Sequence, residues 1–218
     1  MLFLVLIISI ILSLTPWSPT IEKFLLMKRK YISLFFLVIS ALSLLLIFDQ
    51  TWVKDSWEQT IATLWFLLFL PICARVFSLG IPAKWMMYRK EIGILMGTLA
   101  LVHSSQYFLW TWGFTQIFGR DFWIMDGSFR FLGAWFIALV ISTLLLMTSN
   151  GWAVNIMWMK YWKLLHRSVY VLVLFAVIHV VLLTWEMTGF IILGVYLIGK
   201  ILEWRWIVLR KAPRKNPA

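Results

Sequence analysis

Charged residues are scarce in this sequence. Only 13% of the 218 residues are Asp, Glu, Lys or Arg, whereas 62% are hydrophobic and the mean hydropathy is +0.90. A soluble globular domain carries roughly 25% charged residues. The shortage excludes a chain whose surface lies mostly in water, and no segment is long and polar enough to form a second domain. We therefore expect one integral membrane domain.

Cysteine is also rare, and familiar catalytic patterns are missing. Cys73 is the single cysteine, which excludes an intrachain disulfide and a metal site built from several thiolates. No glycine-rich nucleotide motif, P-loop, H-E-x-x-H zinc motif or Ser/His/Asp set is recognisable. The predicted helix interiors lack acidic residues, and no glycine or proline pair breaks two helices at matching positions, which argues against a transporter. No catalytic residue is predicted.

Long apolar runs are what the sequence does contain. A helix needs about 20 apolar residues to cross the hydrocarbon core of a bilayer. Six segments qualify, at residues 31–48, 60–80, 92–112, 130–149, 164–185 and 188–204. A seventh, residues 2–16, lacks the basic region and cleavage site of a signal peptide, so we interpret it as an uncleaved anchor. The spacing of Gly93 and Gly97 is typical of close helix packing.

These segments predict an all-α fold, a polytopic transmembrane helical bundle of six core helices plus an extra N-terminal helix. The expected organisation is an N-terminal hydrophobic anchor and basic loop, the membrane domain itself, and a basic cytoplasmic tail. Their boundaries are 1–30, 31–204 and 205–218.

The basic residues fix an orientation for this bundle. The loops between the segments fall into two alternating sets, one with fifteen basic residues and the other with only three. We assign the second set to the outer face. Cytoplasmic loops carry the excess of Lys and Arg, so the C-terminus is expected inside. The net charge of +11 is thus read as contact with membrane lipid and not with nucleic acid. The expected location is a bacterial inner membrane.

Two of the three histidines are predicted to form a pair. His103 lies 13 residues beyond Lys90, and His179 lies 12 beyond Arg167, on helices that run outward in the same direction. At about 1.5 Å per residue the two imidazoles reach similar heights. Two facing imidazoles suit the axial sites of a b-type haem. The alternative is two unrelated histidines, each bonded to a nearby backbone carbonyl.

His166 is treated separately. It is expected on the same helix as His179, about 20 Å below it, where it would serve either a second, inner haem or flavin, or merely a lipid headgroup. Arginines at the two membrane faces could pair with haem propionates, although each is also a natural headgroup contact. These are Arg75, Arg89 and Arg167 on the inner side, and Arg120 and Arg130 on the outer side.

A group of these residues resembles a known family. The stretch Arg89-Lys-Glu-Ile-Gly93 precedes His103, and Thr148-Ser149, Leu165-His166, Tyr170 and His179 follow. This pattern resembles the ferric reductase-like transmembrane domain, and within it the haem-binding membrane subunits of bacterial protein-methionine-sulfoxide reductase systems.

The resemblance covers about residues 31–204. It implies that His103 and His179 bind haem b, with His166 beside an inner cofactor. FMN or quinone is a further cofactor option.

The resemblance further implies transmembrane electron transfer, as the membrane subunit of an oxidoreductase. Electrons would come from a cytoplasmic flavin reductase or from quinol, and would leave to an outer-side redox protein such as a methionine sulfoxide reductase. One alternative is a stand-alone ferric or metal reductase, or a quinol-linked cytochrome. A second is a cofactor-free membrane scaffold or transporter.

Overall fold

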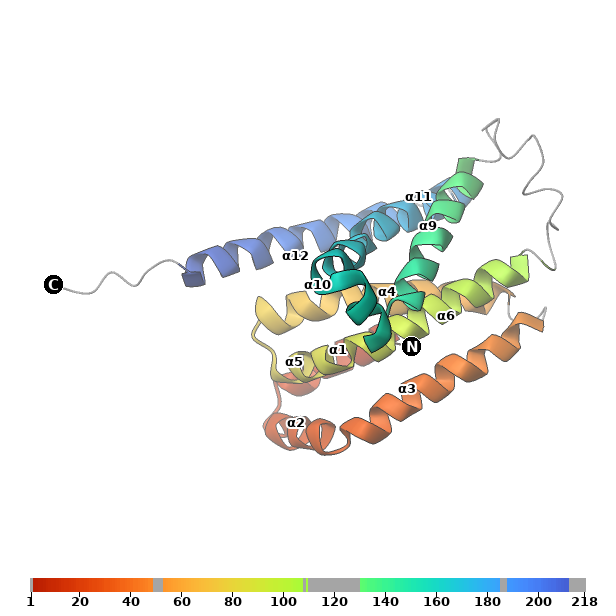
Figure 1. The fold of residues 1–218 in the computed structure, drawn as a ribbon. Coiled ribbons are helices and arrows are strands. Elements are labelled where there is room, and N and C mark those ends of the chain that lie inside the picture. The colour runs from red at the N-terminus through yellow and green to blue at the C-terminus, as the bar shows by residue number, and fades with distance from the viewer. Residues whose placement is uncertain (1, 49–52, 108, 110–129, 185–187, 212–218) are drawn as a thin grey trace.

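The computed structural model describes residues 2–48, 53–107, 109, 130–184 and 188–211. Within these ranges the chain forms helices and no strand, which confirms the all-α prediction. The predicted outer loop 113–129 with Arg120, and tail residues 212–218, lie outside the described residues. The elements in Figure 1 are α1 (Leu2–Ser13), α2 (Ser18–Met27), α3 (Arg29–Ser43), η1 (Leu44–Phe48), α4 (Val53–Arg75), α5 (Gly80–Trp85), η3 (Met86–Tyr88), α6 (Arg89–Tyr107), α9 (Arg130–Met147), α10 (Gly151–Arg167), α11 (Val169–Thr184) and α12 (Thr188–Lys211).

Two stretches of the described chain are long and apolar enough to cross a membrane. They are Arg29–Phe48, with a mean hydropathy of 2.6, and Gly151–His179, with 1.4. Shorter apolar helices cover Leu4–Ser13, Thr60–Arg75 and Gly133–Met147. Length and composition thus give two candidate spans, and the full set of six with an N-terminal anchor stays a prediction.

Five helices pack side by side in a closed order that we call the five-helix ring. Helix α4 packs against α6, α6 against α9, α9 against α11, α11 against α12, and α12 against α4. In Figure 1, α6 and α11 run toward the same end of the bundle, whereas α4, α9 and α12 run the opposite way. Helix α9 packs against both helices that carry His103 and His179.

The N-terminal segment is built into this bundle. Helix α1 packs on α4 and α5, and Leu6 is almost fully buried in the main core. The Trp85 indole donates to Ser9 Oγ at 2.9 Å, and the Tyr88 hydroxyl donates to the carbonyl of Leu25 at 2.8 Å. Residues 18–27, expected as a loop, form helix α2, whose first turn contains Pro19, a residue that suits a helix start.

Several predicted helix boundaries differ from the structure, and helix α4 already begins at Val53, before the predicted start at residue 60. The segment 60–80 ends as helix α4 at Arg75, because Ser78 takes a left-handed backbone conformation (φ 51°) before Gly80 starts α5. The segment 164–185 is divided at Ser168 between α10 and α11, so His166 and His179 lie on different helices. Helix α12 continues to Lys211, past the predicted boundary at 204, and the first proline after it is Pro213.

Gly97 sets the closest approach of α6 to α9. A Cβ atom placed on Gly97 would lie 2.9 Å from the Cβ of Leu146, whereas one placed on Gly93 meets no atom within 4 Å among the described residues. The predicted close packing is thus confirmed at Gly97 and wrong at Gly93. Because the contact would be with the Cβ atom of Leu146, a change of side-chain rotamer cannot relieve it.

This contact yields a matched pair of substitutions. Gly97→Ala should lower the free energy of unfolding by about 1–3 kcal/mol, because α6 and α9 must move apart to seat the methyl group. Gly93→Ala should be neutral or stabilise by up to about 1 kcal/mol, since alanine favours a helix and the space is open. Unfolding titrations in detergent would measure both; equal effects of the two substitutions would contradict the packing argument.

Candidate functional site

His103 and His179 lie on facing parts of the five-helix ring. His103 lies in the last two turns of α6 and His179 in the second half of α11, and both side chains are partly buried. They are close enough that their charges would repel each other if both were protonated. The two histidines that the sequence pairs therefore lie within electrostatic range of each other.

The helices that carry this pair are not close neighbours. Helix α9 packs against both α6 and α11, and among the described residues these two make few close backbone approaches of their own. Ala100 and Ala176, each three residues before a histidine, are small and only partly buried. Two imidazoles that ligate one iron need their backbones held well apart, because the metal and both rings lie between them. The two imidazoles are a donor set that could hold a haem iron, and α9 packs against both of their helices.

His166 lies apart from the pair, at the end of α10. Its ring stacks on the indole of Trp162, with 4.1 Å between the ring centroids, and its Nε2 lies 3.4 Å from Thr148 Oγ1. The Thr148 hydroxyl donates to the carbonyl of Leu144 at 2.6 Å, which leaves the imidazole as the donor in the histidine contact. His166 is thus held against the end of α9.

Helix α10 is folded back on itself to make this contact. Its N-terminus is capped by Asn150, whose side chain accepts from the Ala153 amide at 2.7 Å, and the Trp162 indole donates to the Thr148 carbonyl at 2.9 Å. Between these two bonds, Trp158 has φ 57° and ψ 138°, which breaks the helix. Bulky residues rarely adopt a positive φ, so this position is strained.

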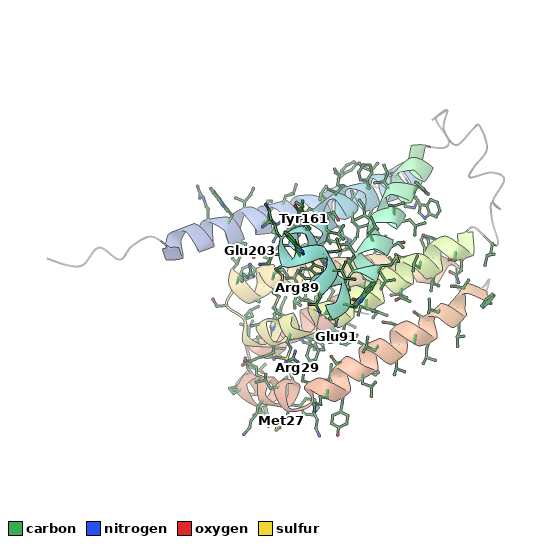
Figure 2. The ribbon with its side chains drawn as sticks, viewed as in Figure 1. Met27, Arg29, Arg89, Glu91, Tyr161 and Glu203 are labelled. Atoms are coloured by element: carbon green, nitrogen blue, oxygen red, sulfur yellow. The ribbon has the colours of Figure 1, made fainter. Side chains whose placement is uncertain are left out.

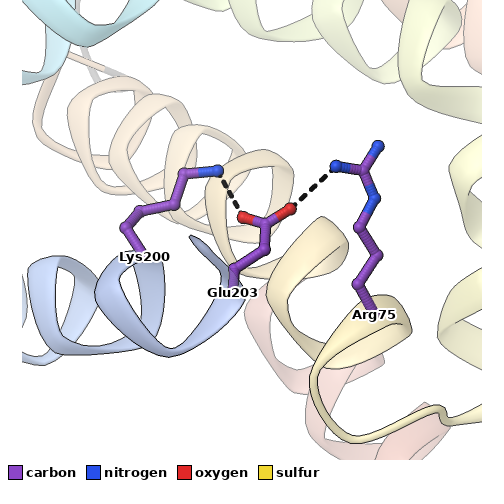
Figure 3. A network of polar contacts seen from close by, with 3 residues as sticks. All are labelled: Arg75, Lys200 and Glu203. Carbon is purple, nitrogen blue, oxygen red and sulfur yellow. Dashed lines mark hydrogen bonds and ion pairs between the residues drawn. The ribbon is translucent and has the colours of Figure 1, made fainter. Parts of the chain in front are cut away.

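Arg75 has a partner that the sequence does not reveal. Its Nη1 donates to Oε1 of Glu203 at 2.8 Å, and Lys200 Nζ donates to Oε2 of the same carboxylate at 2.6 Å (Figure 3). The Glu203 side chain is 5% exposed, against 52% for Arg75. A carboxylate can be buried so deeply because two cations bind it. The bond joins the end of α4 to α12.

The other inner arginines are exposed. Arg89 begins α6 and Arg167 ends α10, and within the described chain neither forms an ion pair. Arg29, Arg89 and Glu203 lie toward the same end of the bundle (Figure 2). Of the outer arginines, the side chain of Arg130, like Arg120, lies outside the described residues.

Sequence reasoning missed Glu203, since the expectation that helix interiors lack acidic residues is wrong there. A signal was present: Glu203 falls inside the predicted segment 188–204, three residues after Lys200. That spacing puts two side chains on the same helix face. The Thr148 and Trp162 contacts to His166 had no such signal, because they depend on the fold of α10.

A search among protein-family models, curated proteins and solved structures finds no match to this chain.

The ion pair between α4 and α12 can be tested through stability. Glu203→Gln should lower the free energy of unfolding by about 1–2 kcal/mol, because it removes charged hydrogen bonds whose cationic partners are partly exposed. Lys200→Gln should cost about 0.5 kcal/mol or less, since it removes only a contact within α12. Chemical unfolding in detergent would compare them. A larger effect for Lys200→Gln would contradict the assignment of Glu203 as the link between helices.

Proposed function

We propose that this chain is a membrane electron-transfer protein whose helical bundle holds a b-type haem between His103 and His179. It would be the membrane subunit of an oxidoreductase in a bacterial inner membrane, with its C-terminus in the cytoplasm. The single observation that supports the proposal is that His103 and His179 lie within electrostatic range of each other on helices that run in the same direction, with α9 packed against both helices.

The chain's own residues would perform three tasks at this site. The imidazoles of His103 and His179 would hold the haem iron, each through one ring nitrogen. Buried apolar side chains next to them on the same two helices, Leu99, Val102 and Val177, would keep water away. The separation of α6 from α11 would be maintained by α9. A haem bound there supplies one-electron chemistry through its iron.

The six predicted spans belong to this proposal. Helices α3, α4, α6, α9, α11 and α12 would cross the membrane, with α1 as the additional N-terminal helix. Their directions alternate along the chain in Figure 1, as successive crossings require. In a bilayer core only helices or closed barrels satisfy their own backbone hydrogen bonds, which the all-helical fold does.

An electron donor would dock on the inner side. Lys160 and Lys163 are exposed on α10, close in sequence to His166. Together with Arg89 and Arg167 they form a positive surface suited to an acidic partner, for which we propose a cytoplasmic flavin reductase. A quinol donor is the alternative, and an outer-side redox protein such as a methionine sulfoxide reductase would be the acceptor. His166 would stand beside the entry point.

The haem site predicts a spectroscopic result. The purified protein, supplied with haem, should show the reduced α-band of a b-type haem, because imidazole on both sides gives a six-coordinate iron. His103→Ala and His179→Ala should each abolish this spectrum. His166→Ala is the matched control and should retain it. Loss of all haem from His166→Ala alone would contradict the pairing, and a haem-free wild-type protein would contradict the function.

Donor docking predicts a kinetic result. The double reversal Lys160→Glu with Lys163→Glu should slow haem reduction by the flavin reductase about 10-fold at low ionic strength, because attraction between the partners is replaced by repulsion. Lys23→Glu with Lys30→Glu changes the charge equally on exposed positions of α2 and α3, away from α10. Stopped-flow reduction would compare the pairs. Unchanged rates for the α10 reversal would remove this docking surface.

A further inference from the structure

Four helices bring a set of charged and phenolic groups together at the inner end of the five-helix ring. We call this set the inner cluster: Arg75 on α4, Arg89 on α6, Tyr170 on α11, and Tyr196, Lys200 and Glu203 on α12. Arg89 lies within electrostatic range of Arg75, Tyr170, Tyr196 and Glu203. Lys200 Nζ lies 5.6 Å from the centroid of the Tyr170 ring.

The inner cluster has more positive charge than its own carboxylate can balance. Glu203 uses one oxygen for Arg75 and the other for Lys200, so its two oxygens are both engaged. Arg89 is left without an ion-pair partner among the described residues. Arg75 keeps further N–H groups beyond the one that it gives to Glu203, since a guanidinium has five. Two positive charges therefore remain uncompensated.

The hydroxyl of Tyr196 is a buried hydrogen-bond donor in the inner cluster. The Tyr196 side chain is 3% exposed, and its hydroxyl has no hydrogen-bond partner in the described part of the chain. The ring is fixed by Trp65 and Phe69, whose centroids lie 6.4 Å and 5.8 Å away. Its electrostatic neighbours are Arg89, Tyr170 and Glu203. A buried hydroxyl without a partner is costly, and a bound oxygen atom would satisfy it.

We propose that the inner cluster binds a phosphate group, with Arg89 and Arg75 as charged donors and the Tyr196 hydroxyl as a third donor. Arginine suits phosphate because its planar fork of N–H groups matches two oxygen atoms at once. A single phosphodiester brings one negative charge, and a phosphomonoester nearly two, against the two positive charges left over.

The surroundings favour a phosphate carried by a phospholipid. On α12, Ile198 and Ile201 flank the charged residues and are 61% and 59% exposed, and Phe77, just after α4, is 60% exposed. Acyl chains would cover such side chains while the headgroup reaches the cations. The cytoplasmic leaflet is the one rich in anionic lipid, and the basic end of the bundle is the predicted inner end. This inference does not depend on haem.

The test measures binding by the full-length, delipidated protein in detergent. Phosphatidylglycerol retained after washing would be quantified by native mass spectrometry, with a galactosyl diacylglycerol, which has no phosphate, as the reference lipid. We expect selective retention of phosphatidylglycerol. Arg89→Gln should weaken it about 10-fold or more, and Tyr196→Phe about 3-fold or more, by the loss of one donor each. Glu203→Gln should strengthen it, because a repelling carboxylate is gone.

Lys90→Gln is the matched control, since Lys90 is exposed beside Arg89 but is not part of the inner cluster. It should leave retention within about 2-fold, because only the diffuse positive potential changes. Retention unaffected by both Arg89→Gln and Tyr196→Phe, or equal retention of the galactolipid, would overturn the proposal. If millimolar inorganic phosphate displaces the retained lipid, the site binds phosphate and free phosphate is a sufficient ligand. Retention without such competition would support the lipid as the source.

Discussion

The packing of α9 between α6 and α11 is the constraint on which the rest of this structure depends. It contacts α11 along much of its length and meets α6 where Gly97 faces Leu146. Without a side chain at Gly97 the two backbones can approach closely, and this fixes α6 relative to α9. Since α11 is fixed to the other side of α9, the positions of His103 and His179 follow from two helix contacts.

Charge is arranged very differently at the two levels of the bundle. Beside the histidine pair lie buried apolar side chains (Leu99, Val102 and Val177) and two uncharged polar ones, Ser104 and Gln106. At the inner end, cations from three helices surround the Glu203 carboxylate. The charged cluster and the imidazole pair therefore lie at different positions along the helices: Arg89 begins α6, whereas His103 lies in its last two turns. The same division separates the proposed electron carrier from the proposed phosphate contact.

The sequence predicts the features that repeat along it. Helical segments, their alternating direction and the common height of His103 and His179 come from counting residues in apolar runs, because a helix has a constant rise. The break at Ser168 could not be predicted, since Leu165 to Tyr170 contains neither proline nor glycine. Its cause is tertiary: the end of α10 is held to Thr148, which redirects the chain before α11 begins. The ion pair of Glu203 with Arg75 joins helices far apart in sequence and cannot be predicted from residue spacing. Only the contact of Glu203 with Lys200, three residues away, can be predicted in that way.

The backbone of Trp158 has a consequence for α10 as a whole. Fourteen residues of straight helix would place Trp162 about 21 Å from Thr148, whereas the bond between them is 2.9 Å long. The segment is therefore a closed loop, and the positive φ at Trp158 is the bend that lets it close. Such a residue stores about 1–3 kcal/mol. The contacts of the Trp162 indole and the His166 imidazole with Thr148 hold the two ends of this bent segment together.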